Sequence, residues 1–254
     1  MKFYIYHKIV TMKKLIIPFL FILLILSLNC ENSDEQPVIQ STLLTCLPAN
    51  LQSDLIAFYP FNNGSLNDES GNNNNLLNNT SANSTTDRNG NINCAFNFNS
   101  SNNEFLEYNN PTFLDDLPQN NFSISFWYKA NNDIGYSQFI HRNGVQNYGQ
   151  WYVEFVDEFF AFGANGANGS GHHISFLDWE HIVLTVSGTN LNFYKNGVLE
   201  SQQSNQSSTN PTVNQGDLFI GKSLDGQMDD IIIYDKELNP MEISGLFNMS
   251  PCCN

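Results

Sequence analysis

The stretch GQMDDIIIYD, residues 226–235, places two adjacent carboxylates directly before a strongly β-forming run. A buried strand normally excludes a doubled charge such as that of Asp229 and Asp230. Three interpretations are open: the pair is catalytic, it binds a metal, or it marks the point where a strand leaves solvent. Because neighbouring strand residues point to opposite sides, only one of the two can easily donate its side chain to a single site.

A second group of carboxylates lies in the stretch EFVDEF. A retaining glycosidase needs two carboxyl groups about 5–5.5 Å apart, which on one strand means residues two or four positions apart. Glu154 and Glu158 share a face, but Asp157 falls on the opposite one, so the spacing of the three acids does not match a catalytic pattern. The two histidines of SGHHIS lie in a glycine-rich stretch, which we interpret as an exposed loop, without the Glu-x-x-His spacing of a metal site. We therefore expect no catalytic residues and no enzymatic activity.

Aromatic side chains among amides could perform a different chemistry, because sugar faces stack on aromatic rings while amides and carboxylates bind hydroxyl groups. The densest such cluster lies in IGYSQFIHRNGVQNYGQWYVEF and comprises Tyr136, Asn143, Asn147, Tyr148, Gln150, Trp151 and Tyr152. We expect Tyr136, Asn147, Tyr148 and Trp151 to bind a ligand. The alternative is that Trp151 and Tyr152 divide between core and surface by alternation, which leaves only the other two tyrosines exposed.

The elements that must position these residues are short β-strands. In NFSISFWYKA, Phe122, Ile124 and Phe126 alternate with polar residues, which is the period of a half-buried strand. Nine more runs of this kind are separated by stretches rich in Asn, Gly and Ser, such as NNGSLNDESGNNNN and ANGANGSG, which predict turns. One predicted turn is at Asn196-Gly197, the type of residue pair that a type I' hairpin turn requires. About a dozen strands predict an all-β fold of two packed antiparallel sheets.

One short C-terminal helix is predicted in LNPMEISGLFN. Asn239 can cap it, Pro240 occupies the first helical position, and Glu242 completes a capping box. The apolar stripe of the helix would close the edge of the sandwich. No linker or repeat interrupts residues 51–248, which we expect to be one domain, followed by a cysteine-containing tail at 249–254.

Residues 1–29 have the features of an export signal, with Met12 as a candidate true start. Lys13 and Lys14 precede an apolar run of fourteen residues, which is shorter than the roughly 20 that a membrane span needs. Because residues 1–29 contain four lysines and no acid, their removal changes the net charge from −15 to −19. So acidic a chain excludes nucleic-acid binding through phosphates, and its many carboxylates suit calcium.

The apolar run ends at Cys30, which resembles the lipidated cysteine of bacterial lipoproteins. The acidic stretch ENSDEQP that follows is similar to the one after the lipid cysteine in surface-exposed lipoproteins of Bacteroidetes-type bacteria. This resemblance implies a lipidated acidic tether at residues 30–50 and an exported protein held on the outer membrane, exposed at the cell surface. The alternative is secretion after ordinary signal cleavage.

Four further cysteines, Cys46, Cys94, Cys252 and Cys253, are expected to be disulfide partners in an exported protein. Three connectivities are possible. A bridge from Cys46 to Cys252 or Cys253 would join termini that a closed sandwich brings close together. Cys94 would then take the other cysteine or stay free, and a bridge between the two adjacent cysteines is the least favoured.

Five motifs in order resemble a laminin-G-like jelly roll of the concanavalin A-like lectin/glucanase superfamily. They are LIAFYPFNNGSLNDESGNNNNL, AFNFNSSNNEFLEY, NFSISFWYKA, LDWEHIVLTVSGTNLNFYKNGVL and GKSLDGQMDDIIIYDKELNPMEISGLF. The resemblance extends from about Leu55 to Phe247 and implies a two-sheet antiparallel jelly-roll sandwich. The glucanases of this superfamily carry Glu-x-Asp-x-(x)-Glu, which EFVDEF does not match.

The resemblance also implies a structural calcium ion. In related sandwiches this ion lies where the Asp-x-Ser-Gly loop meets the Asp-Asp strand, and here these are Asp68 in DESG and the pair Asp229 and Asp230. Calcium takes 6–8 oxygen ligands, which a loop containing Gly71 and Asn74 can help to supply. The alternative is that Asp68 caps a turn and the pair is a solvated strand start.

Sandwiches of this type include binding modules, adhesins and glycosidases. The combination of an exposed aromatic cluster, a lipid anchor and no catalytic carboxylates predicts a lectin-like surface module that binds a glycan or a glycosylated partner. The alternatives are an adhesion or protein-interaction module that binds no sugar and, less favoured, a divergent glycosidase.

Overall fold

The computed structural model describes residues 46–115, 121–132, 136–143, 151–156, 159–164, 167–173, 175–188, 190–204 and 216–253. The chain divides into the units Met1–Ile39 and Gln40–Asn254, and the described residues belong to the second. The predicted signal, Cys30 and most of the tether therefore lie outside the described residues, as do Asn147 and Tyr148. Within the described ranges, no helix is long and apolar enough to span a membrane.

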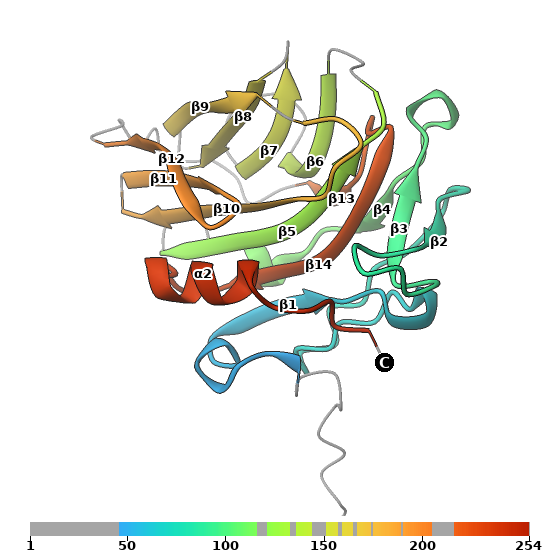
Figure 1. The fold of residues 1–254 in the computed structure, drawn as a ribbon, viewed down its shortest axis with the longest axis horizontal. Coiled ribbons are helices and arrows are strands. Elements are labelled where there is room, and N and C mark those ends of the chain that lie inside the picture. The colour runs from blue at the N-terminus through green and yellow to red at the C-terminus, as the bar shows by residue number, and fades with distance from the viewer. Residues whose placement is uncertain are drawn as a thin grey trace, which may run out of the picture. The chain divides into compact units, whose positions relative to one another are not determined.

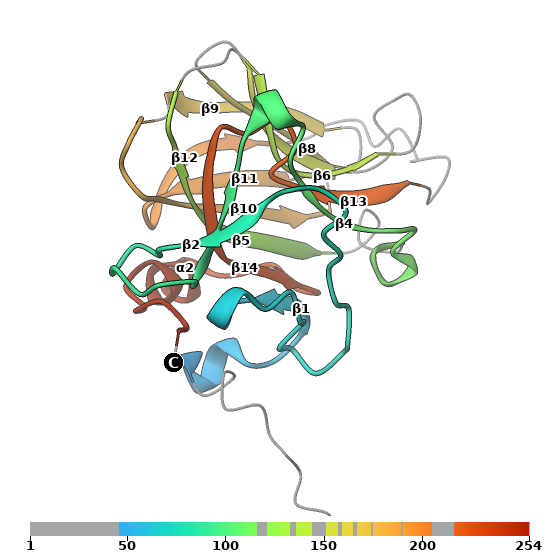
Figure 2. The same cartoon turned by 90° about the vertical axis from the view of Figure 1, so that its right-hand side faces the viewer.

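The strands form two antiparallel sheets that pack face to face (Figures 1 and 2). The first sheet has eight strands in the order β12-β11-β10-β5-β14-β3-β2, with β1 also paired to β14. They are β1 (Leu55–Tyr59), β2 (Asn83–Thr85), β3 (Ala95–Phe98), β5 (Phe122–Ala130), β10 (Glu180–Ser187), β11 (Asn190–Lys195), β12 (Val198–Gln203) and β14 (Gly226–Tyr234).

The second sheet has six strands in the order β4-β13-β6-β7-β8-β9. They are β4 (Leu106–Tyr108), β6 (Tyr136–Asn143), β7 (Trp151–Val156), β8 (Phe159–Ala164), β9 (Ala167–His173) and β13 (Asp217–Ile220). The described part of the chain also contains four single-turn 3-10 helices, η2 (Ala49–Leu51), η3 (Asn62–Gly64), η4 (Ser100–Asn102) and η5 (Thr112–Leu114). The predicted all-β fold of two antiparallel sheets is confirmed.

Two hydrophobic clusters lie on opposite faces of the first sheet. Phe122, Ile124 and Phe126 of β5 belong to the main core between the sheets, as their alternation predicts. Ser123, Ser125 and Trp127, which point to the other face, are also buried, so β5 is buried on both faces rather than on one. The reason is a second cluster, to which the chain-terminal segments contribute Leu51, Leu246 and their neighbours, and which covers the other face.

The helix α2 (Pro240–Phe247) packs on that second face of the first sheet, and it lies beside β5 and β14 in Figure 1. The predicted capping box is confirmed, because the Asn239 side chain accepts hydrogen bonds from the backbone N–H groups of Met241 and Glu242 while Glu242 accepts one from Asn239. Ile243 and Leu246 are buried. Asparagine and proline therefore place the helix start where its apolar stripe meets the sheet.

Two local predictions had opposite outcomes. Asn196 and Gly197 both have positive φ, 49° and 78°, and connect β11 to β12 as the predicted hairpin turn. The glycine-rich stretch ANGSGHH was expected to be a loop, and this expectation was wrong because its backbone forms β9, which pairs with β8. A ladder needs only backbone donors and acceptors, so a neighbouring strand can order a segment of low strand propensity.

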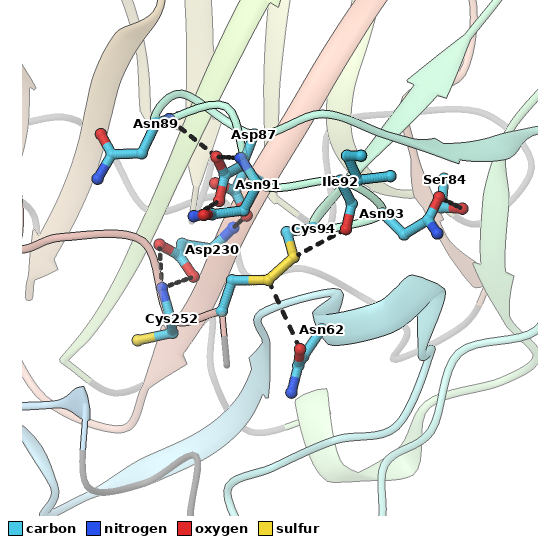
Figure 3. Close-up of a disulfide and its surroundings, with 12 residues drawn as sticks. Asn62, Ser84, Asp87, Asn89, Asn91, Ile92, Asn93, Cys94, Asp230 and Cys252 are labelled. Atoms are coloured by element: carbon cyan, nitrogen blue, oxygen red, sulfur yellow. Dashed lines mark hydrogen bonds between the residues drawn. A yellow bond between two sulfur atoms is a disulfide. The ribbon is translucent and has the colours of Figure 1, made fainter.

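Two disulfides fasten the C-terminal tail. Cys46 bonds to Cys252 and Cys94 bonds to Cys253, with Cα atoms 5.6 and 5.9 Å apart. The first joins the beginning and end of the domain, which is one of the pairings that the sequence left open. The second ties the tail to the segment that leads into β3 (Figure 3).

The first residue of β14 generates a test of the register. A Cβ atom on Gly226 would lie against the Lys129 carbonyl oxygen and 3.0 Å from Ala130 Cα. We expect Gly226→Ala to lower the free energy of unfolding by about 1–3 kcal/mol, measured by urea denaturation. The control is Gly245→Ala in α2, where the nearest atom is 3.6 Å away, and which should be neutral or stabilising. Equal effects of the two substitutions would contradict the register of β14 against β5.

Candidate functional site

The predicted Asp229–Asp230 pair is held by an arginine. Arg88 Nη1 lies 2.7 Å from Asp229 Oδ2 and 2.8 Å from Asp230 Oδ2. The three side chains are almost completely buried. A β-bulge makes this possible, because the register of β14 against β5 shifts between Asp229 and Ile232 and Asp230 adopts a positive φ of 44°. The bulge lets both carboxylates reach one cation, which a regular strand would prevent.

We call Arg88, Asp229 and Asp230 the buried charge triad. Neighbouring groups make further contacts with its charged atoms. The Arg88 guanidinium lies 4.4 Å from the centre of the Trp127 ring and donates to the Met249 carbonyl oxygen at 3.2 Å. The Asp230 carboxylate accepts from the Cys252 backbone N–H, as Figure 3 shows. Burial raises the pKa of Asp229 and of Asp230, and Arg88 opposes that rise. The guanidinium thus supplies the positive charge that a metal ion was expected to supply.

Asp68 has a different structural role from the predicted one. Its Oδ1 accepts from the backbone N–H groups of Phe58 and Ser70, and its Oδ2 from that of Asn74, all at 2.9 Å. Its carboxylate therefore closes the loop that contains Gly71, which is the turn-capping alternative. Gly71 adopts a positive φ of 94°, which favours glycine.

The expected calcium clasp is not formed by these residues. β1 pairs with β14 as the clasp requires, but Asp68 does not come within ligand distance of both Asp229 and Asp230. Among the described ranges, only one set of three His, Cys, Asp or Glu side chains lies close enough together to hold a metal ion. It consists of Asp87, Cys94 and Cys253, and its two cysteines are joined in a disulfide. In the structure each of the three carboxylates is bound by protein donors, and calcium binding itself stays a prediction.

The sequence offered one overlooked signal for Arg88. A doubled carboxylate in an apolar strand requires a counter-charge, and the chain contains only two arginines, Arg88 and Arg142. Both arginines are buried and each pairs with an acidic side chain. Arg142 contacts Asp115 at 2.5 Å, as Arg88 contacts Asp229. Which arginine meets which acid depends on tertiary structure, since Arg88 and Asp229 are 141 positions apart.

A Ser–His pair also lies on the second face of the first sheet. Ser125 Oγ is 2.8 Å from His181 Nε2, the arrangement of a nucleophile with its base. Both residues are buried, and Nδ1 of His181 has no acidic partner among the described residues. Burial lowers the pKa of His181 to about 3. Because the Phe247 ring stacks over His181 from α2, no substrate reaches this pair, and we interpret it as a structural contact.

The candidate binding surface lies on the outer face of the second sheet. Ile140, Val153 and Leu218 point into the core, so the residues that alternate with them point away from it. We define these outward residues, with two side chains that pack beside them, as the sheet-face patch. Its members are Phe105, Tyr136, Gln138, His141, Tyr152, Glu154, Phe219 and Lys222.

One half of the sheet-face patch is polar. The Tyr136 hydroxyl donates to Glu154 Oε2 at 3.1 Å, and Tyr136 is 42% exposed. Partial burial, with the Glu154 charge, raises the pKa of Tyr136 to about 12, and burial also raises the pKa of Glu154. A phenol that stays protonated and a carboxylate held beside it can both bind sugar hydroxyl groups, with the ring as a stacking surface.

The other half of the sheet-face patch is aromatic. The rings of Phe105 and Phe219 meet edge to face at 5.3 Å, and Lys222 Nζ lies 4.0 Å from the Phe219 ring centre. His141 lies beside Tyr152, with ring centres 6.2 Å apart. Burial, with the nearby Lys222 charge, lowers the pKa of His141 to about 4. His141 is therefore neutral near pH 7 and adds a polar edge without a charge.

The predicted aromatic cluster maps onto this face only in part. Tyr136 and Tyr152 belong to the sheet-face patch. Trp151 is the first residue of β7, and its side chain lies outside the described residues. Asn147 and Tyr148 also lie outside them, so the role of these three as ligand contacts stays a prediction. Gln138, His141 and Phe219 were not singled out, because their common face depends on pairing among three strands.

The two packed antiparallel sheets define the fold as a jelly-roll sandwich. A laminin G family model, described as the concanavalin A-like lectin/glucanases superfamily, matches residues 101–244. The chain belongs to this superfamily, and the predicted resemblance is confirmed. No curated protein matches the sequence.

Among solved structures, the binding domain of botulinum neurotoxin serotype C1 is similar, with a TM-score of 0.63 and 19% identity over 78% of this chain and 52% of that one. The binding domain of Paraclostridial Mosquitocidal Protein 1 gives a TM-score of 0.66 and 20% identity over the same shares. The binding domain of botulinum neurotoxin DC, solved with rat synaptotagmin II, gives 0.61 and 19%, again over 78% and 52%. The chain thus spans about half of each, and the likeness shows the fold.

The buried charge triad generates the second prediction. Arg88→Met leaves two adjacent buried carboxylates without a cation, so we expect the free energy of unfolding to fall by about 3–5 kcal/mol at pH 8. The loss should be smaller near pH 4. Aspartates in the unfolded chain titrate near 3.9, and the folded pKa values are raised, so stability falls as the pH rises from about 4 toward the folded values.

The control is the triple variant Arg88→Met, Asp229→Asn, Asp230→Asn, which removes the charges together. Its stability should depend less on pH than that of Arg88→Met. Urea denaturation at several pH values measures both proteins. A loss in Arg88→Met that stays constant from pH 4 to pH 8 would show that Arg88 acts through packing alone.

Proposed function

We propose that this domain is a non-catalytic binding module that recognises a glycan through the sheet-face patch. The observation that carries the proposal is the exposed Tyr136 ring fixed by its hydrogen bond to Glu154, beside Tyr152 and Gln138 on one open sheet face. Rings that are held in place by neighbours stack on sugars at little entropic cost, and adjacent carboxylate and amide groups bind hydroxyls.

The similar solved structures support a binding role of this kind. They are binding domains; cell entry of botulinum neurotoxin type C depends on interaction with two ganglioside molecules, and the binding domain of neurotoxin DC is seen in complex with rat synaptotagmin II. Gangliosides carry sugars and synaptotagmin is a protein, so both glycan and protein partners fit this fold. An adhesion role without sugar is therefore the second candidate. The predicted lipid anchor at Cys30 would hold the module on the outer membrane, exposed at the cell surface.

A glycan array with the full-length protein tests the proposal. We expect specific binding to a restricted set of glycans, lost by about tenfold or more in Tyr136→Ala and reduced in Glu154→Gln, because stacking and one charge-assisted hydrogen bond are removed. The control is Leu199→Ala, an exposed residue of β12 in the other sheet, which should bind as the parent does. Binding to no glycan would favour the adhesion role, and hydrolysis of any polysaccharide that Glu154→Gln abolishes would refute the non-catalytic assignment.

Calcium stays a prediction from the sequence, and a melting curve measures it. An ion that binds only the folded protein raises the melting temperature. If calcium binds, the increase in millimolar calcium over EDTA should persist in Asp68→Asn, because the Asp68 carboxylate is filled by three backbone donors. An increase that Asp68→Asn abolishes would instead restore Asp68 as a ligand.

A further inference from the structure

A cavity of about 400 Å³ lies between the start of β1, the loop after Asp68 and the end of β14, apart from the sheet-face patch. Two carboxylates, Asp54 and Asp235, stand on its rim, and both are exposed. Asn72, Asn74 and Phe113 also line it. Its volume is within the range of ligand pockets, which is roughly 300–1,000 Å³.

The amides of this pocket present their oxygen atoms to a ligand. Asn72 Nδ2 donates to the carbonyl oxygens of Leu55 and Ile56 at 2.8 and 3.1 Å, and Asn74 Nδ2 donates to that of Ile56 at 2.9 Å. Asn74 is nine-tenths buried, and its Oδ1 accepts no hydrogen bond within the described residues. Because both Asn72 side-chain N–H groups and one of the two on Asn74 are used on the β1 backbone, most of the amide capacity that remains for a ligand is that of acceptor oxygens.

The charge of the pocket is negative and only partly compensated. Lys236 Nζ lies 3.7 Å from Asp54 Oδ2, but it lies closer, at 3.1 Å, to Glu242 Oε1. The Asp235 carboxylate contacts no cation in the described part of the chain. A site with two carboxylates and two amide oxygens attracts a group that donates several hydrogen bonds and carries positive charge.

The aromatic wall favours an organic cation. Phe113 is partly buried, and its ring packs edge to face on Tyr108 at 4.9 Å, so its position is fixed. An aromatic ring in the wall of a negatively charged pocket can stabilise an ammonium or guanidinium group by cation–π attraction, and it offers no oxygen ligand to a metal ion.

We propose that this pocket is a second binding site, which takes the ammonium or guanidinium group of a lysine or arginine side chain from a protein partner. The net charge of the chain, −15, also draws basic partners toward it. This site is separate from the proposed glycan surface, and either one can fail without the other.

The probes are Nα-acetyl-lysine amide and Nα-acetyl-arginine amide, titrated into ¹⁵N-labelled full-length protein. We expect millimolar affinity with shifts of the Asp54 and Asp235 amides, weakened by added salt. The neutral analogues, Nα-acetyl-norleucine amide and Nα-acetyl-citrulline amide, should cause no such shifts. Equal binding of the neutral analogues, or no binding of either cation at about 10 mM, would overturn the proposal.

Three variants assign the binding to this pocket. Asp54→Asn and Asp235→Asn should each weaken it by about two- to fivefold, and Asn at position 54 keeps the left-handed backbone, where φ is 62°. Lys236→Met removes the competing cation and should strengthen binding about twofold, a gain that no folding defect explains.

Two controls complete the test. Asp178→Asn, an exposed carboxylate elsewhere, and Tyr136→Ala on the sheet-face patch should both leave the affinity for the lysine probe unchanged. Binding of methyl glycosides or calcium at these amides with greater affinity than the lysine probe would refute the choice of ligand.

Discussion

The buried charge triad is the interaction on which the arrangement of the first sheet depends. Removing two carboxylates from water is unfavourable unless a cation and further donors meet them, and only the bulge in β14 allows one guanidinium to satisfy both. Arg88 comes from the turn before β3, and its other contacts are Trp127 of β5 and the tail at Met249. The triad therefore determines how the turn before β3, the strands β5 and β14, and the C-terminal tail are arranged around one another.

The sequence predicted correctly those elements whose formation depends on residues close together in the chain. The alternation in β5, the cap of α2 at Asn239 and the turn at Asn196 and Gly197 each depend on residues a few positions apart, and each is found where the sequence placed it. The strand β9 was missed because its order comes from pairing with β8 and not from its own glycine-rich residues.

The candidate sites were harder to predict because their members meet only through tertiary structure. The sequence marked Asp68, Asp229 and Asp230 as carboxylates in need of partners, and that need is real. The partners are three backbone N–H groups for Asp68 and Arg88 for the pair, neither of which spacing along the chain reveals. Likewise, Tyr136 was predicted as a contact residue, but its partner Glu154 was considered only as a catalytic acid.

The pairing of Cys46 with Cys252 has a mechanical consequence. A load that enters the domain at Cys46 passes through a covalent bond to the tail and, through Cys253, on to Cys94 at the start of β3. That path bypasses the hydrogen bonds between β1 and β14, which form the first ladder along the chain after Cys46. Tension applied at Cys46 is therefore carried by the two disulfides into β3, and it does not have to pass through β1.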